Sequence, residues 1–202
     1  MIILVLQNSL IMDVEMNCVN LVITGNPGVG KHTIADLFIK QDSSYQIFDI
    51  NKFAIEKGFG EKIDDGIEVD TTKLKSEIGK LNFEKSIIVG HLAPYVLDES
   101  DIDFVIILRK NPYELVKIYE ERKYQSSKIK ENAGSEILGV IANDSITSFG
   151  KKKSFEVDVT NKTPEMILEK IHDITNNQKG SDAIDWLRLI EEKNEIGKFF
   201  DY

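Results

Sequence analysis

Short apolar runs alternate along the chain with longer stretches in which apolar residues recur every three or four positions. Runs at 19–24, 45–48, 86–89, 104–108 and 154–159 predict five strands, and most of these are rich in β-branched residues. The runs at 86–89 and 104–108 are apolar almost throughout, which is typical of central parallel strands covered on both faces. Strands that alternate with helices predict an α/β fold with a doubly wound, five-stranded parallel sheet.

The stretches between these strands carry helical patterns, of which the spacing of Ile34, Leu37 and Phe38 is one example. Asp49 is placed to cap the next helix, because its carboxylate can accept hydrogen bonds from the free N–H groups of the first turn. Proline has a fixed φ that suits the first turn of a helix, and it begins two others. We expect helices at 31–40, 50–57, 71–81, 112–121, 128–146, 164–175 and 182–194.

We divide the 202 residues into an N-terminal extension at 1–17, a main domain at 18–178 and a C-terminal helix at 179–202. The apolar start of the chain lacks the basic region and cleavage site of a signal peptide, and it is too short to span a bilayer. A loosely packed extension, or a start codon placed too early, is favoured over any membrane role.

Composition narrows the classes of function. The net charge of −9 disfavours non-specific binding to DNA, which needs clustered cations, but it would attract a basic protein. Cys18 is the one cysteine in the sequence, so no intramolecular disulfide can form and a reducing, cytoplasmic setting is expected. With no paired Cys/His cluster, a structural zinc site is not expected.

The segment 25–33 reads GNPGVGKHT and stands between the first strand and the first helix. It fits the phosphate-binding pattern G-x-x-x-x-G-K, in which backbone N–H groups and the start of the helix surround an anion. Lys31 supplies a charge for the β- and γ-phosphates of ATP. An ordinary glycine-rich turn is the alternative, and the strand–loop–helix context favours nucleotide binding. We expect contacts to the nucleotide from Gly25, Pro27, Gly28, Val29, Gly30, Lys31, His32 and Thr33.

The position after Lys31 departs from the general motif. His32 stands where Ser or Thr usually binds Mg²⁺, and imidazole is a poor ligand for so hard a cation. Adenylate kinases commonly have G-K-G-T here, and Lys31-His32-Thr33 resembles that arrangement. We therefore expect ATP with Mg²⁺ as cofactors, and Thr33 as the hydroxyl available to the metal or to a phosphate.

A second motif follows the helix at 112–121. Its spacing is R-x-Y-x-x-x-K-x-x-x-N-x-x-x-E, and its members are Arg122, Tyr124, Lys128, Asn132 and Glu136. Together with the GNPGVGK loop and a strand that leads to His91, this motif resembles the adenylate kinase isoenzyme 6 family over about residues 18–175.

The resemblance implies a nucleoside monophosphate kinase fold, with a monophosphate-binding insertion at about 48–71 and a short lid at about 121–131. It also implies ATP and AMP as substrates, and a role in maturation of the small ribosomal subunit. The insertion contains an acidic run, which is either a solvated loop or a contact for a basic partner such as a ribosomal protein; its members are Asp64, Asp65, Glu68 and Asp70. Asp70 is equally explained as a helix N-cap.

Three side chains form the catalytic set that we expect: Lys31, His91 and Arg122. A lid arginine would neutralise charge on the transferring phosphoryl group, although a solvated helix-end arginine is the simpler alternative. His91 lies at the carboxyl edge of the sheet, which favours a role near the γ-phosphate or its water over a purely structural one. The acid that the family has two residues earlier is replaced by Val89.

For two further residues, the sequence allows more than one role. Arg109 follows the strand at 104–108, so it could stack on adenine, contact phosphate or simply mark the solvent end of the strand. Asn161 follows the fifth strand, at a position that resembles the one where the family closes over adenine, and a turn residue is the alternative.

These observations support an enzyme that transfers the γ-phosphoryl group of ATP to AMP or another monophosphate. An ATPase that times release of a basic small-subunit ribosomal protein is compatible with this. Val89 and His32 suggest a third possibility, a nucleotide-dependent protein-binding switch with weak turnover. A different small-molecule kinase is the alternative within the same fold.

Overall fold

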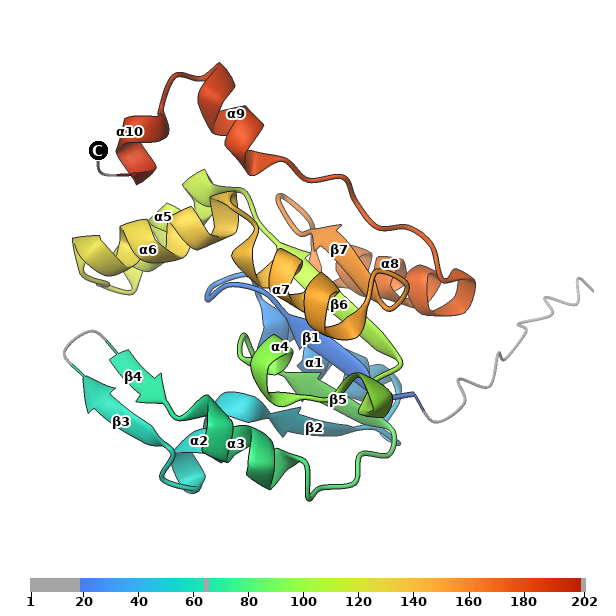
Figure 1. The fold of residues 1–202 in the computed structure, drawn as a ribbon. Helices are drawn as coiled ribbons and strands as arrows, with labels where there is room; N and C mark the ends of the chain where they lie inside the picture. The colour runs from blue at the N-terminus through green and yellow to red at the C-terminus, as the bar shows by residue number, and fades with distance from the viewer. Residues whose placement is uncertain (1–18, 64–65, 201–202) are drawn as a thin grey trace, which may run out of the picture.

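The structure, a computed structural model, describes residues 19–63 and 66–200 (Figure 1). Its strands are β1 (Leu21–Thr24), β2 (Gln46–Asp49), β3 (Gly60–Ile63), β4 (Gly66–Val69), β5 (Ser86–Val89), β6 (Phe104–Arg109) and β7 (Ser154–Asp158). Its helices are α1 (Lys31–Gln41), α2 (Ile50–Glu56), α3 (Thr71–Ile78), α4 (Ala93–Val96), a 3-10 turn at Glu99–Asp101, α5 (Pro112–Glu121), α6 (Ser126–Ile137), α7 (Val140–Phe149), α8 (Pro164–Asn177), α9 (Trp186–Glu192) and α10 (Ile196–Phe199). The expectations for 1–17, Cys18, Asp64 and Asp65 fall outside these residues.

Within the described residues, the main sheet has five parallel strands in the order β2-β5-β1-β6-β7. Successive residues of a strand point to opposite faces, so Leu21 and Ile23 belong to one apolar cluster and Val22 to another. Helices α1 and α8 cover the first face, while α3, α4 and α7 cover the second (Figure 1). The predicted doubly wound α/β fold is therefore confirmed.

The chain between β2 and β5 holds α2, the antiparallel hairpin β3–β4 and α3. Asp49 caps α2 by accepting a hydrogen bond of 3.0 Å from the backbone N–H of Lys52, as the sequence predicted. Asp70 caps α3 in the same way, through the N–H of Lys73. From the sequence, no strand is expected between the helices at 50–57 and 71–81, whereas the structure forms a hairpin there that extends away from the main sheet (Figure 1).

The helix predicted at 128–146 is wrong, because the structure divides it into α6 and α7. Gly139 lies between them with a φ of +64°, a left-handed conformation that stops α6. A Cβ atom built on Gly139 would lie 3.4 Å from Nη1 of Arg109, so the guanidinium occupies the space next to this glycine. The break is therefore part of how α6 and α7 pack around Arg109.

The single C-terminal helix predicted at 182–194 is also wrong. Asp182 instead bonds to β7: its N–H donates to the carbonyl of Glu156 at 2.9 Å, and its carboxylate accepts from the N–H of Asp158 at 2.9 Å. Helix α9 begins only after Asp185, which caps it through the N–H of Arg188. Helices α9 and α10 then pack over α5 and α6 and form a third apolar cluster there (Figure 1).

No helix in the part of the chain that the structure describes is long and apolar enough to cross a membrane.

Candidate active site

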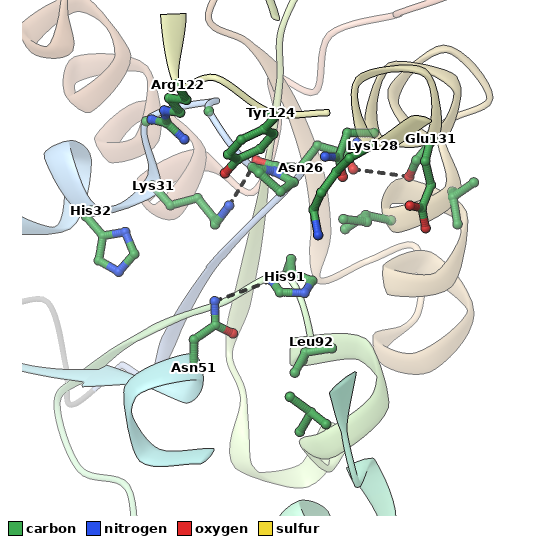
Figure 2. A pocket seen from close by; sticks show the side chains of 18 of the residues that line it. Asn26, Lys31, His32, Asn51, His91, Leu92, Arg122, Tyr124, Lys128 and Glu131 are labelled. Atoms are coloured by element: carbon green, nitrogen blue, oxygen red, sulfur yellow. Dashed lines mark hydrogen bonds between the residues drawn. The ribbon is translucent and has the colours of Figure 1, made fainter. Parts of the chain in front are cut away.

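A cavity of about 860 Å³ opens at the carboxyl ends of β1 and β5 (Figure 2). The phosphate loop and the start of α1 form one wall, the segment after β5 forms the floor, and the α5–α6 connection with α6 forms the opposite wall. Residues of α2, β4 and α7 complete it. Of the residues predicted to contact the nucleotide or to act in catalysis, the cavity brings together Pro27, Gly28, Gly30, Lys31, His32, Thr33, His91 and Arg122.

The shape of the phosphate loop depends on glycine at its first position. Gly25 has a φ of +131°, and a Cβ atom there would lie 2.3 Å from the carbonyl oxygen of Leu108. Gly25 and Val29 support the loop from behind and do not line the cavity, and Val29 is buried in the core. Gly30 is the N-cap of α1 and has no side chain to cap it, so the first N–H groups of this helix are suited to an anion.

Lys31 is folded back onto the loop that it follows. Its ammonium donates to the carbonyl oxygens of Gly25 at 2.8 Å and Asn26 at 2.9 Å, and only 8% of the residue is exposed. Burial, followed by the positive charge of Arg122, lowers the pKa of Lys31 to about 8. Anionic phosphates at this position would supply the charge partner that the buried ammonium needs.

His32 and Thr33, which follow Lys31, are the residues whose position matters for magnesium binding. Nε2 of His32 lies 2.7 Å from Oδ2 of Asp49, so the imidazole is hydrogen-bonded to this carboxylate. Thr33 lines the cavity and is exposed. Mg²⁺ usually keeps several waters and is held by phosphate oxygens with one or two protein ligands. The described residues contain no cluster of three His, Cys, Asp or Glu side chains that could hold a metal.

Asp49 lies close to Val89, the position where the sequence lacks the acid that the resembled family has. In the β2–β5 register Asp49 is paired with Val89, so the carboxylate stands one strand away from the position expected to hold it. Burial opposes its ionisation, but hydrogen bonds from Lys52 and His32 keep its pKa below the usual range. Asp49 does not line the cavity itself, but it places an ionised carboxylate next to His32, on β2 instead of β5.

His91 lies on the floor of the cavity, where the side-chain nitrogen of Asn51 is 3.4 Å from its Nδ1 (Figure 2). Burial, and then the charges of Lys31 and Lys128, lower the pKa of His91 to about 4. The imidazole is therefore neutral at pH 7. The Oδ1 atom of Asn51 is buried without a hydrogen-bond partner, which suits it to a bound ligand.

Sequence reasoning gave Asn51 no role, because an asparagine in the first turn of a predicted helix carries no chemical signal by itself. Asn132 was noted as part of the lid motif, and its Nδ2 is also buried without a partner on the cavity wall. Both amides thus offer unused hydrogen-bonding groups at the same cavity.

The opposite wall is joined to the phosphate loop through aromatic residues. Tyr124 lines the cavity and stacks on Tyr119, with ring centroids 5.6 Å apart and planes inclined by 7°. The hydroxyl of Tyr119 donates to the carbonyl of Pro27 at 2.7 Å. Arg122 lies between these tyrosines in the sequence and is exposed at the end of α5. The wall therefore presents a charged group on a segment that is anchored to the loop.

Arg109 and Asn161 do not line this cavity. Arg109 is 4% exposed, and its Nε donates to Glu136 at 2.8 Å while its Nη1 pairs with Glu156. Its Nη2 donates to the backbone carbonyl of Glu136 at 2.7 Å, so all three guanidinium nitrogens are bonded within the fold. The buried side chain therefore does not mark a solvent end of the strand. Asn161 is exposed in a turn with a φ of +53°, which agrees with the turn alternative.

Comparison with known proteins places this geometry among nucleotide-binding folds. Residues 21–139 match the family model described as "AAA domain". A protein of Pyrococcus abyssi named "Putative adenylate kinase" is 33% identical over 173 residues, which cover 84% of this chain and 92% of that protein. One of the same name from Methanococcus maripaludis is 34% identical over 175 residues, covering 82% and 93% of the two chains.

A crystal structure of shikimate kinase from Bacteroides thetaiotaomicron has the same fold. The TM-score is 0.53 and the sequence identity is 16%, and the match covers 78% of this chain and 98% of that one.

Proposed function

Because the chain belongs to the AAA domain family and to the family of these archaeal relatives, we propose that it is an ATP-dependent nucleoside monophosphate kinase with AMP as acceptor. The observation that carries the proposal is one cavity shared by the phosphate loop, Arg122, Lys128 and His91. Its volume of about 860 Å³ lies near the upper end of the range for ligand pockets, about 300–1,000 Å³, which leaves room for a second substrate beside ATP.

In this proposal the loop and Lys31 bind the β- and γ-phosphates, and the lid side chain Arg122 neutralises charge on the transferring group. A phosphate oxygen of the acceptor bonds to the γ-phosphorus while the bond to the leaving ADP oxygen breaks. Such a transfer depends mainly on positioning and on charge stabilisation, and the cavity supplies both. Mg²⁺ would add charge neutralisation between the phosphates, with Thr33 as its protein ligand.

His91 acts in this scheme as a neutral hydrogen-bond donor. With the amide nitrogen of Asn51 directed at Nδ1, that ring nitrogen accepts and the ring proton is on Nε2. The low pKa of His91 makes a charged general acid unsuitable at pH 7. Nε2–H can instead orient a phosphate oxygen or a water near the γ-phosphate.

The test is ATP turnover measured alone and with each nucleoside monophosphate. AMP is expected to raise ADP formation well above basal hydrolysis, and Lys31→Met is expected to abolish both. If no monophosphate raises ADP formation, the kinase assignment fails. If ATP hydrolysis persists although no monophosphate stimulates it, the protein is an ATPase and not a kinase.

A second candidate is a nucleotide-dependent switch or ATPase that binds a basic small-subunit ribosomal protein. One observation favours it: Glu61 and Glu68 are exposed and stand directly opposite each other in the β3–β4 register. Like charges in this position are destabilising unless a cation lies between them. Pull-down of basic ribosomal proteins at moderate salt, with Glu61→Gln/Glu68→Gln as the comparison, tests this. Equal capture by both proteins, or capture by neither, would contradict it.

A further inference from the structure

The carboxylate of Glu136 is fully buried and accepts hydrogen bonds from four separate positions of the chain. Its Oε1 accepts from Nε of Arg109 at 2.8 Å, from the backbone N–H of Lys110 at 3.1 Å and from the indole N–H of Trp186 at 3.0 Å. Its Oε2 accepts from the side-chain amide of Asn26 at 2.7 Å. One carboxylate thus joins the phosphate loop to the C-terminal helix α9.

On the loop side, Asn26 has little freedom to move. Besides the bond to Glu136, its Oδ1 accepts from the hydroxyl of Ser135 at 3.1 Å. Its backbone carbonyl accepts from the ammonium of Lys31 at 2.9 Å. The position of Asn26 therefore helps to fix both the loop backbone and the lysine that faces the phosphates.

On the other side, the C-terminal helices α9 and α10 lie next to α6 (Figure 1). Helix α6 thus separates them from the cavity. One face of α6 lines the cavity through Asn132 and Ser135. Ala133 and Ile137 are buried in the third apolar cluster, among residues of α9 and α10. A Cβ atom on Gly134 would lie 3.2 Å from the ring of Phe200, so the C-terminal segment approaches α6 closely.

We propose that Glu136 is a positioning residue that holds the phosphate loop in its nucleotide-binding shape, and that Trp186 of α9 keeps Glu136 in place. Nucleotide in the loop and the docking of the C-terminal segment are then coupled through one carboxylate. The inference rests on the proposed function only in that the loop must bind a nucleotide. It assigns a role to a segment, residues 181–200, that the proposed chemistry does not use.

The matched variants are Trp186→Phe and Arg188→Ala. Phenylalanine keeps an aromatic ring in the cluster but removes the N–H donor, and Glu136 retains its three other donors, so no buried charge is left unpaired. Arg188 is on the same helix, is exposed, and is paired with Glu192. ADP binding is measured by calorimetry, together with the thermal midpoint of the unliganded protein.

Trp186→Phe is expected to raise the Kd for ADP about tenfold, the size expected for a hydrogen bond to a charged group. Arg188→Ala should bind ADP like the unmodified protein. Equal ADP affinity in all three proteins would overturn the inference. If the unmodified protein binds no ADP, the proposed function itself fails, which is a different result from loss of the coupling alone.

If Trp186→Phe does not fold, a second measurement tests the coupling in the unmodified protein. Trp186 is the one tryptophan in the sequence, so the fluorescence of the unmodified protein reports on this residue alone. Its emission should change as ADP is added and saturate at the Kd found by calorimetry. Emission that stays constant while calorimetry shows ADP binding would contradict the coupling.

Discussion

The side-chain nitrogen of Asn51 lies 3.4 Å from Nδ1 of His91 on the floor of the cavity. The amide nitrogen can only donate, so the ring accepts at Nδ1, while burial and the nearby Lys31 and Lys128 keep the imidazole neutral. The floor thus presents a directed hydrogen-bond donor without adding charge to a cavity that already contains several cations. This arrangement has a measurable consequence for stability.

Stability should fall below pH 6.5 because of His91. Its pKa is about 4 in the folded protein and 6.5 in a free histidine, so the unfolded chain binds more protons in this range and acid favours unfolding. The full shift corresponds to at most about 3 kcal/mol. Urea unfolding at pH 7.0, 5.5 and 4.5 checks this against His91→Gln, which should lose less stability on acidification. Parallel pH dependence in the two proteins would contradict the assignment.

Nucleotide binding should take up a proton at Lys31 above pH 8. The pKa of Lys31 is about 8 in the free protein, and bound phosphates would raise it, so binding above that pH requires protonation. Affinity for ADP is then constant below pH 8 and about tenfold weaker at pH 9 than at pH 7. Calorimetry in two buffers of different ionisation enthalpy measures the proton uptake. Lys31→Arg, whose charge does not titrate here, should show none.

Arg122→Ala should lower turnover by about 10²–10³-fold while leaving stability nearly unchanged. The side chain is exposed at the cavity, so little of the fold depends on it. Lys117 of α5 is an exposed cation that does not line the cavity, and Lys117→Ala is the control. Steady-state ADP formation and urea unfolding separate the two effects. An equal loss of turnover in both variants would show a general charge effect instead of a role for Arg122.

Gly139→Ala should destabilise the protein by about 1–2 kcal/mol, because alanine is strained at a left-handed φ. The φ of Gly139 is +64°, and the added methyl would lie 3.4 Å from the Arg109 guanidinium. Gly197 of α10 has nothing within 4 Å of a built Cβ atom, so Gly197→Ala should be neutral or slightly stabilising. Urea unfolding of the two variants measures the difference. A stable Gly139→Ala protein would show that the break between α6 and α7 does not depend on glycine.

The sequence predicted the parts of this structure that local pattern determines. Central strands such as β6 are continuous apolar runs, and the phosphate loop has fixed spacing, so both were found where expected. The caps at Asp49 and Asp70 are also local, because each accepts from a residue three positions later.

Features that depend on distant partners could not be predicted in this way. The helix break at Gly139 involves a distant residue, Arg109, which packs against a glycine of left-handed φ. Glu136 was noted as the last position of a motif, but its partners Asn26 and Trp186 are 110 and 50 residues away in the sequence. The pairing of Asp49 with Val89 likewise follows from strand order, which periodicity does not reveal.

The most direct test of the kinase activity traces the transferred phosphoryl group. ATP labelled in its γ-phosphate is incubated with AMP and Mg²⁺, and the label is traced into ADP or into free phosphate. We expect most of the label in ADP, with transfer that requires AMP and is lost in Lys31→Met. Label recovered only as free phosphate, at a rate that AMP does not change, would contradict the kinase assignment.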